Sequence, residues 1–160
     1  YWVCKRCPPF VNEAQECLGG AGYVEESILP RLYRQAPLNA IWEGSGNIQC
    51  LDVLRALARE PETWQALFAE FASSKGESHL LDDAVEALGK SLADTASIEA
   101  RSRGIVEQMA ICLQAAVLLK SGNDRVAREF CRTRLGGNNK MFGAEAISGA
   151  SELIAGSFLQ

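Results

Sequence analysis

The sequence predicts an all-α fold, a bundle of packed helices. Apolar residues recur at three- and four-residue spacing, which is the period of a helix with one buried face. Runs in which β-branched and polar residues alternate are missing, so nothing in the pattern favours a sheet. Proline and glycine divide the chain into segments of helical length. These three observations together are typical of a helical bundle.

The punctuation also predicts the order of the elements. Pro8 and Pro9 predict the start of a first helix, since proline is tolerated in a first turn, and Gly19–Gly20 predict its end. Residues 21–30 are expected to form a loop, and Pro30 to begin a short helical turn that Pro37 ends. Further helices are expected at about 46–59, from Pro61 through Phe71, and at about 79–96, 98–120, 123–135 and 140–157.

Composition excludes some classes of protein. The 160 residues suffice for one domain with a core. The formal net charge of -4 argues against a wholly basic nucleic-acid binder, although a local basic face stays open. No apolar run approaches 18 residues, so we expect no membrane span, and we expect no signal peptide. The opening stretch YWVCKRC is typical of a chain interior, so we expect a piece of a longer polypeptide.

The cysteines favour reduced thiols over a metal centre or a redox site. They stand at positions 4, 7, 17, 50, 112 and 131. Cys4 and Cys7 form a CxxC, but a zinc site needs about four ligands, and the lone His79 is distant in sequence. No βαβ pattern accompanies the CxxC, as a redox motif would require. We therefore expect no metal, and buried thiols in a cytoplasmic protein.

The stretch NAIWEGSGNIQ places a single carboxylate, Glu43, between two apolar residues and a Gly-Ser-Gly run. Partial desolvation would raise the pKa of such a carboxylate toward the range of a general base. Gly44 and Gly46 would let a ligand approach the backbone, and the following helix N-terminus would favour a developing negative charge. Proton abstraction beside a carbonyl fits this arrangement. A plain structural role, an acid that complements the helix dipole beside a loop, is the simpler interpretation of these residues taken alone.

Two further patterns could meet phosphates. The glycine pair in ECLGGAGY exposes backbone N–H groups that could meet a pyrophosphate, or is simply a helix C-cap. In residues 123–140, the spacing i, i+3, i+7 puts Arg125, Arg128 and Arg132 on one helical face, with Arg134 and Lys140 nearby. Such a stripe could bind nucleic-acid phosphates.

Internal ion pairing is the alternative explanation for the arginine stripe. Residues 61–100 hold eight acids and two bases, whereas residues 101–160 hold eight bases and five acids. The arginines could therefore pair with the acidic helices of residues 61–100.

LGGAGY, then PRLYR, then IWEGSGNIQ resembles, in that order and spacing, the C-terminal helical domain of the flavin-dependent acyl-CoA dehydrogenases. The resemblance implies that Glu43 removes the substrate α-proton while hydride from the β-carbon passes to FAD. It also assigns each motif residue a place: Gly44 against the acyl-CoA thioester, Ser45 and Asn47 at flavin-contacting positions, and Gly19 and Gly20 against the pyrophosphate or adenosine across a subunit interface. Two positions depart from the family pattern, since Glu16 and Asn47 each stand where the family has Gln.

A long helical segment, residues 44–160, follows Glu43, and this resembles the AidB-like branch of the family, which is associated with the response to DNA alkylation. The resemblance implies a dehydrogenase-like domain over residues 1–60 and an extra helical domain over residues 61–160. It further implies a homotetramer, arranged as a dimer of dimers, and an acyl-CoA-type substrate. The alternative it offers is a module that binds double-stranded DNA through Arg125, Arg128 and Arg132, with weak or vestigial dehydrogenase activity.

Overall fold

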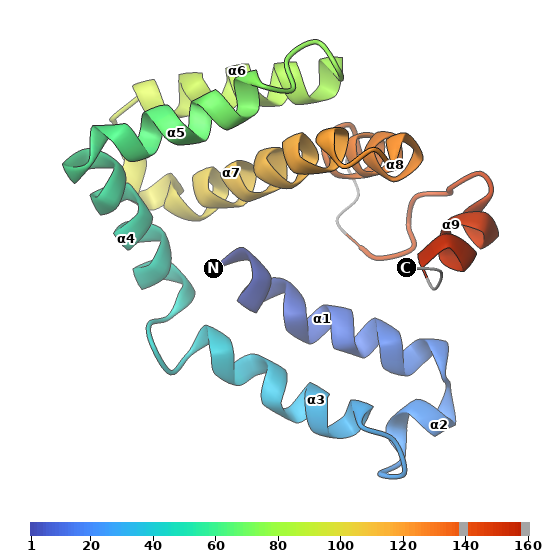
Figure 1. Ribbon diagram of the computed structural model, residues 1–160. Helices are drawn as coiled ribbons and strands as arrows, with labels where there is room; N and C mark the ends of the chain where they lie inside the picture. Colours follow the sequence, from blue (N-terminus) through green and yellow to red (C-terminus); the bar gives the residue numbers. More distant parts are fainter. Residues whose placement is uncertain (138–140, 158–160) are drawn as a thin grey trace. The chain divides into compact units, whose positions relative to one another are not determined.

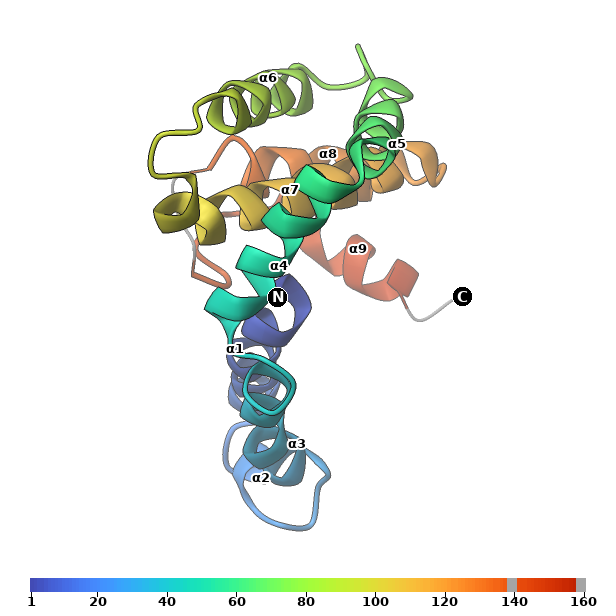
Figure 2. The ribbon, with the colours of Figure 1, turned by 90° about the vertical axis from the view of Figure 1, so that its left-hand side faces the viewer.

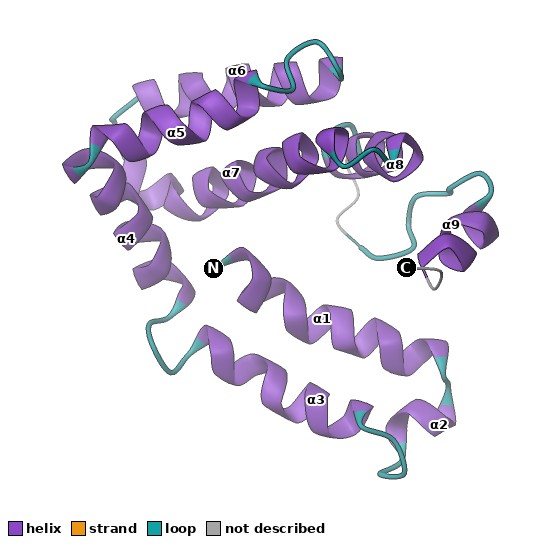
Figure 3. Cartoon of the chain, viewed as in Figure 1, coloured by secondary structure: helices purple, strands orange, loops and turns teal. Residues whose placement is uncertain are grey.

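The computed structural model describes residues 1–137 and 141–157, and every regular element within them is a helix (Figure 1, Figure 3). The elements are α1 (Trp2–Cys17), α2 (Gly20–Tyr23), α3 (Leu29–Gln35), the 3₁₀ helix η1 (Ala36–Ala40), α4 (Gly46–Arg59), α5 (Pro61–Ala72), α6 (His79–Ala93), α7 (Ile98–Lys120), α8 (Asp124–Arg134) and α9 (Ala150–Ser157). The all-α prediction is confirmed.

The chain divides into two compact units. The first comprises Tyr1–Trp64 and Ser91–Ala110, and the second comprises Gln65–Lys90 and Ile111–Gln160. The domain boundary predicted between residues 60 and 61 stays a prediction.

In the first unit, α1 and α3 form an antiparallel pair that α2 joins at one end (Figure 1, Figure 2). The 3₁₀ helix η1 continues α3 along the same side of α1. Val11 of α1 and the small residues Ala36 and Ala40 are buried, and small side chains let helices approach closely. Cys50 of α4 is fully buried as well. This pairing fixes the turn that follows η1, where Glu43 lies.

The second unit has its own core. Its buried apolar residues come from α5, α6, α7 and α8: Phe71, Leu81, Leu88, Cys112, Ala115, Ala116, Ala127 and Cys131. Ser74, in the turn after α5, is fully buried and its hydroxyl donates to the Ala116 carbonyl of α7 at 3.1 Å. A buried hydroxyl needs such a partner, so this bond ties the α5–α6 turn to α7.

The predicted start of the first helix is wrong. The helix α1 begins at Trp2 and contains Pro8 and Pro9 in its interior. Each proline removes one N–H donor, yet the upstream turn forms because the Lys5 N–H donates to the Tyr1 carbonyl at 3.0 Å. Packing against α3 and η1 then supports the helix on both sides of the prolines.

Two other predicted boundaries are also wrong. The expected loop at residues 21–30 is partly helical, since α2 extends to Tyr23 and α3 begins at Leu29. Gln15 Nε2 donates to the Gly22 carbonyl at 3.1 Å and holds α2 against α1. The last helix begins at Ala150 rather than at 140. Carbonyl groups before it, including that of Ala146, accept from arginine side chains instead of from helical N–H groups. Residue 140 itself lies outside the described residues.

The helix α6 is shorter than predicted, because it ends at Ala93 and not at about residue 96. Arg101 of α7 donates to the carbonyls of Ser91, Asp94 and Ala96 at 3.0, 2.5 and 3.0 Å. These bonds satisfy carbonyl groups that one more helical turn would otherwise use. One arginine therefore fixes the α6–α7 connection.

The helix α7 has the length and hydropathy of a membrane-spanning segment, with 23 residues and a mean hydropathy of 1.2 in its most apolar window. The central helix of a soluble core passes the same test. Ile105, Cys112, Ala115 and Ala116 of α7 are almost fully buried. These residues supply core packing in their own units, and 33% of the most apolar window of α7 is buried.

Thiol labelling should separate the buried from the exposed cysteines. All six thiols are free, and burial together with the neighbouring Cys131 raises the pKa of Cys112 to about 11. Only about one in a thousand Cys112 side chains would then be thiolate at pH 8, and thiolate is the reactive form. Cys17 is exposed. We predict that a maleimide at pH 8 labels Cys17 readily and Cys112 only on unfolding, as measured by peptide mass spectrometry. Labelling of both at the same rate in folded protein would contradict this.

Candidate functional site

Glu43 lies on a short exposed turn between η1 and α4 (Figure 1). The Ile41 and Trp42 N–H groups both donate to the Leu38 carbonyl, at 2.9 and 3.1 Å, which closes the turn. Ile41 and Trp42 are 65% and 64% exposed, so their side chains do not cover the carboxylate. Glu43 therefore faces solvent, with a large apolar surface beside it.

The two residues after Glu43 shape the backbone for close approach. Gly44 has φ of +118°, a conformation that side-chain-bearing residues rarely adopt. Ser45 is the extended N-cap of α4, and its hydroxyl makes no capping hydrogen bond. The first intrahelical bond runs from Gln49 N to Ser45 O at 3.0 Å, so the N–H groups of the first turn have no helical acceptor. The result is an uncapped helix N-terminus next to a carboxylate.

Gly46 anchors this N-terminus to the beginning of α1. A Cβ at Gly46 would lie 2.7 Å from Cε of Lys5 and 3.2 Å from the Tyr1 ring, and Gly46 is buried. A side chain there would require the Lys5 side chain to move and would crowd the Tyr1 ring. The N-terminus of α4, with the exposed Ser45 and Asn47, therefore lies against side chains from the beginning of α1.

Sequence reasoning missed Gln49, the last residue of the stretch NAIWEGSGNIQ. Its Oε1 atom is buried and has no hydrogen-bond partner among the described residues. A buried amide oxygen without a partner is costly, and such atoms often meet a ligand or an ordered water. A Cβ added at Gly44 would lie 4.0 Å from Cγ of Gln49, so this side chain adjoins the glycine that follows Glu43. No sequence signal distinguishes Gln49 from an ordinary helix-surface glutamine.

The glycine pair lies at the other end of α1. Gly19 has φ of +56°, and a Cβ at Gly19 or Gly20 would meet nothing within 4 Å, so this backbone is open. Glu16 is exposed and its carboxylate accepts from Asn12 Nδ2 at 2.7 Å. Gly22 is different, because a Cβ there would lie 2.3 Å from the Gln15 carbonyl oxygen. The turn therefore combines an open glycine pair with one glycine required by packing.

A pocket of about 430 Å³ adjoins this turn. It is lined by Gln15, Tyr23, Val24, Glu25, Glu26, Pro30, Tyr33 and Arg34. Arg34 donates to both carboxylate oxygens of Glu25, and this hydrogen bonding lowers the pKa of Glu25. The same contact raises the pKa of Arg34. The charged pair therefore stays ionised at neutral pH in a pocket whose lining also includes two tyrosines and a second carboxylate, Glu26.

The structure does not bring the glycine pair of LGGAGY close to Glu43 of IWEGSGNIQ. Gly46 touches Tyr1 and Lys5 at the start of α1, whereas Gly19 and Gly20 follow its end. A helix of 16 residues is about 24 Å long at 1.5 Å per residue. Glu43 and the glycine pair are thus separated by roughly the length of α1. They can contact the two ends of an extended ligand, or two different ligands.

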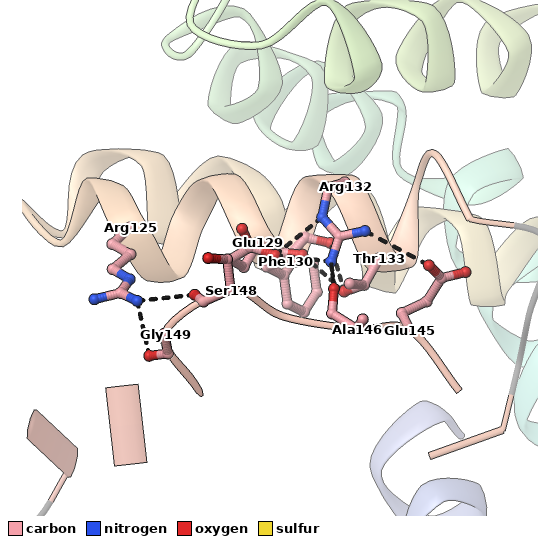
Figure 4. Close-up of polar contacts among 9 residues, drawn as sticks. All are labelled: Arg125, Glu129, Phe130, Arg132, Thr133, Glu145, Ala146, Ser148 and Gly149. Carbon is pink, nitrogen blue, oxygen red and sulfur yellow. Dashed lines mark hydrogen bonds and ion pairs between the residues drawn. The ribbon is translucent and has the colours of Figure 1, made fainter. Parts of the chain in front are cut away.

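In the second unit, the predicted arginine stripe lies on α8, and Asn123 caps this helix by accepting from Val126 N at 3.2 Å. Arg125 and Arg132 are engaged by the segment that precedes α9 (Figure 4). Arg128 is the most exposed of the three, with 71% of its side chain accessible, and approaches Asp124 at 4.0 Å. Lys140, expected beside the stripe, lies outside the described residues.

The alternative interpretation, in which the stripe pairs with the acidic helices of residues 61–100, is wrong for Arg125 and Arg132. Their carboxylate partners are Glu152 for Arg125, and Glu129 and Glu145 for Arg132. A basic residue that does pair with the acidic helices is Lys120, which contacts Glu70 of α5. The numbers of acidic and basic residues in each half of the chain could not predict these partners, because they do not show which carboxylates lie beside the arginines in the folded structure.

Comparison with known proteins gives a consistent result. Residues 1–58 match the family model of the acyl-CoA dehydrogenase C-terminal domain. AidB of Escherichia coli (strain K12), an acyl-CoA dehydrogenase family member, is 45% identical over 133 residues, which are 83% of this chain and 24% of AidB.

Two further relatives carry dehydrogenase names. Acyl-CoA dehydrogenase family member 11 of Caenorhabditis elegans is 48% identical over 54 residues, 34% of this chain and 9% of that protein. Butyryl-CoA dehydrogenase of Syntrophomonas wolfei is 30% identical over 123 residues, 69% of this chain and 20% of that protein. The chain spans about a quarter or less of the length of these relatives.

The glycine turn offers a matched pair of substitutions. Gly22→Ala should destabilise the first unit by about 1–3 kcal/mol, because its Cβ would overlap the Gln15 carbonyl. Gly20→Ala, two residues away, has open space and should change the melting temperature little. Thermal unfolding followed by circular dichroism measures both. Equal melting temperatures for the two variants would show that Gly22 is not required by packing.

Proposed function

The chain is an AidB-like homologue that carries an acyl-CoA dehydrogenase C-terminal domain over residues 1–58, and from this premise we propose that it forms part of an FAD-dependent acyl-CoA dehydrogenase-like oxidoreductase. The observation that carries the proposal is the arrangement around Glu43. An exposed carboxylate precedes a glycine at φ +118° and the uncapped N-terminus of α4. A base, room for a substrate and a positive dipole end are thus consecutive along the chain.

Each residue of this turn has a role in the proposed reaction. A carboxylate oxygen of Glu43 accepts the α-proton of an acyl thioester, as a general base. Gly44 leaves space for the thioester, since no side chain projects from it. The free N–H groups in the first turn of α4 favour negative charge that develops on the thioester oxygen. Bound substrate would cover Glu43 and exclude water, which this turn does not do by itself.

The residues present fit a flavin dinucleotide. Ser45 and Asn47 are exposed at the N-terminus of α4 and would hold the ring system through hydroxyl and amide groups. The open backbone at Gly19–Gly20 would receive the pyrophosphate or adenosine part, across a subunit interface. Glu16 adds a negative charge there, which the amide of Asn12 partly satisfies. The bound flavin would supply the acceptor for the hydride from the substrate β-carbon.

An oligomer of the full-length protein is part of the proposal. Large apolar side chains on α1, α2, η1 and the Glu43 turn remain exposed, among them Val3, Phe10, Tyr23, Leu38, Ile41 and Trp42. Extended apolar surface of this kind marks contact sites. We therefore propose a homotetramer, a dimer of dimers, that acts on an acyl-CoA-type substrate in the cytoplasm.

Glu43→Gln in the full-length protein tests the chemistry. The amide has nearly the same shape but cannot accept the proton, so flavin reduction by an acyl-CoA should slow by about 10²–10⁴ while flavin content is retained. Stopped-flow bleaching of flavin absorbance with a panel of acyl-CoAs measures the rate. Glu62→Gln, which changes an exposed first-turn glutamate of α5, is the control and should react normally. Wild-type rates in Glu43→Gln would remove Glu43 from the role of base.

A second candidate function is binding of double-stranded DNA, with dehydrogenase activity weak or vestigial. The observation that favours it is the exposed arginine face of α8, on which 71% of the Arg128 side chain is accessible. Residues 101–160 are net basic although the whole chain is acidic. Arg125, Arg128 and Arg132 would contact phosphates, which carry no sequence information.

Arg128→Ala tests this candidate most cleanly, because the ion pair of Arg128 within residues 1–137 and 141–157 is a distant one, with Asp124 at 4.0 Å. The logarithmic salt dependence of duplex binding should become shallower by roughly one per binding face, as expected for one lost phosphate contact. The melting temperature should change little, since an exposed ion pair contributes about 0–1 kcal/mol. A salt titration of duplex binding by fluorescence anisotropy measures the slope, and an unchanged slope would exclude Arg128 from the interface.

A further inference from the structure

The segment formed by residues 145–152, here called the strap, lies along α8 and occupies two of its arginines (Figure 4). Arg125 donates through Nη2 to the carbonyls of Ser148 and Gly149, at 2.9 and 2.7 Å, and through Nη1 to Glu152. Arg132 donates through Nη2 to the Ala146 carbonyl at 2.7 Å, and its Nη1 lies 3.5 Å from Glu145 Oε2. Arg125 and Arg132, seven residues apart on α8, therefore both bind the strap.

The fit at Gly149 shows how closely the strap and Arg125 approach. Gly149 has φ of +65°, and a Cβ there would lie 2.0 Å from Nη2 of Arg125. Any side chain at this position would displace the guanidinium. The contact is thus specific in shape as well as in charge.

The groups that the strap presents are those that a polyanion would replace. The Glu152 carboxylate and three carbonyls accept hydrogen bonds from guanidinium donors, and Glu145 forms an ion pair with Arg132, as phosphate oxygens would. The strap contacts are at the surface, with 72% of the Glu152 side chain and 38% of the Arg125 side chain exposed. Exposed pairs of this kind are weak and sensitive to salt, so a phosphate backbone can compete with them.

We propose that the strap is an internal competitor for the anionic ligand of α8, so that phosphates gain access to Arg125 and Arg132 only when residues 145–152 leave the helix. This inference rests on the proposal that α8 binds DNA, and it adds the means by which that binding is restrained. Arg128, which the strap does not grip, would provide the first contact with the duplex.

Two variants of the full-length protein release the arginines in different ways. Glu145→Gln with Glu152→Gln removes the competing carboxylates, and Gly149→Ala displaces the Arg125 guanidinium without a change of charge. The control is Glu77→Gln with Asp83→Asn, which removes two charges from exposed acids that are not partners of Arg125 or Arg132. Binding of a short duplex of unrelated sequence is followed by anisotropy over a range of NaCl concentrations, with melting temperatures alongside.

We expect the double glutamine variant to bind the duplex roughly tenfold more tightly than wild type at low salt, with a salt slope steeper by up to about two for the two freed arginines. Gly149→Ala should bind more tightly as well, whereas the charge-matched control should not. Adding Arg125→Ala and Arg132→Ala to the double glutamine variant should remove the gain.

Other results would overturn the inference. If wild type binds DNA and both releasing variants bind no better than the control, the strap does not compete, although DNA binding itself stands. If the gain survives loss of Arg125 and Arg132, the freed site lies elsewhere. If neither wild type nor any variant binds the duplex at low salt, both the inference and the DNA-binding proposal fail.

Discussion

Close contact between the beginnings of α1 and α4 determines much of the first unit. It depends on the missing side chain of Gly46, which lets the helix backbone lie against Lys5 and the Tyr1 ring. Because α4 starts there, the preceding turn must reverse over a few residues, and Gly44 adopts a conformation open chiefly to glycine. Glu43 is exposed at this reversal as a consequence. The proposed base is therefore positioned by backbone packing, with its own side chain left free.

Helix boundaries were predictable where local chemistry alone decides them. The start of α4 at Gly46 and the full extent of α7 agree with the apolar periodicity of the sequence. The start of α1 was not predictable, because tertiary packing supports a helix across Pro8 and Pro9. The start of α9 was missed for a similar reason. Arginine side chains from α8 take the backbone carbonyls before Ala150, and no local pattern reveals such a partner.

The candidate site shows the same division. Glu43, Gly44 and the glycine pair were predicted from residue types and order, and their roles in a site stay predictions; the positive φ of Gly19 and Gly44 is a local backbone feature that a glycine in the sequence can indicate. The buried Oε1 of Gln49 could not be predicted, because burial without a partner depends on neighbours from other elements. The spacing of Arg125 and Arg132 correctly predicted a shared face, yet not that the strap occupies it. The sequence shows how many carboxylates could pair with the arginines, whereas the folded structure determines which of them do.

The length of α1 also sets the separation between the Glu43 turn and the glycine pair Gly19–Gly20. Its first turn is fixed by Gly46 and its last turn leads into Gly19–Gly20, so the number of residues between them sets both a distance and an angle. Inserting one residue would move the glycine turn by about 1.5 Å and rotate it by roughly 100°. Surface loops tolerate length changes easily. We expect α1 not to tolerate an insertion. The number of residues from Tyr1 to Gly19 constrains the candidate site as much as the side chains at the two ends of the helix do.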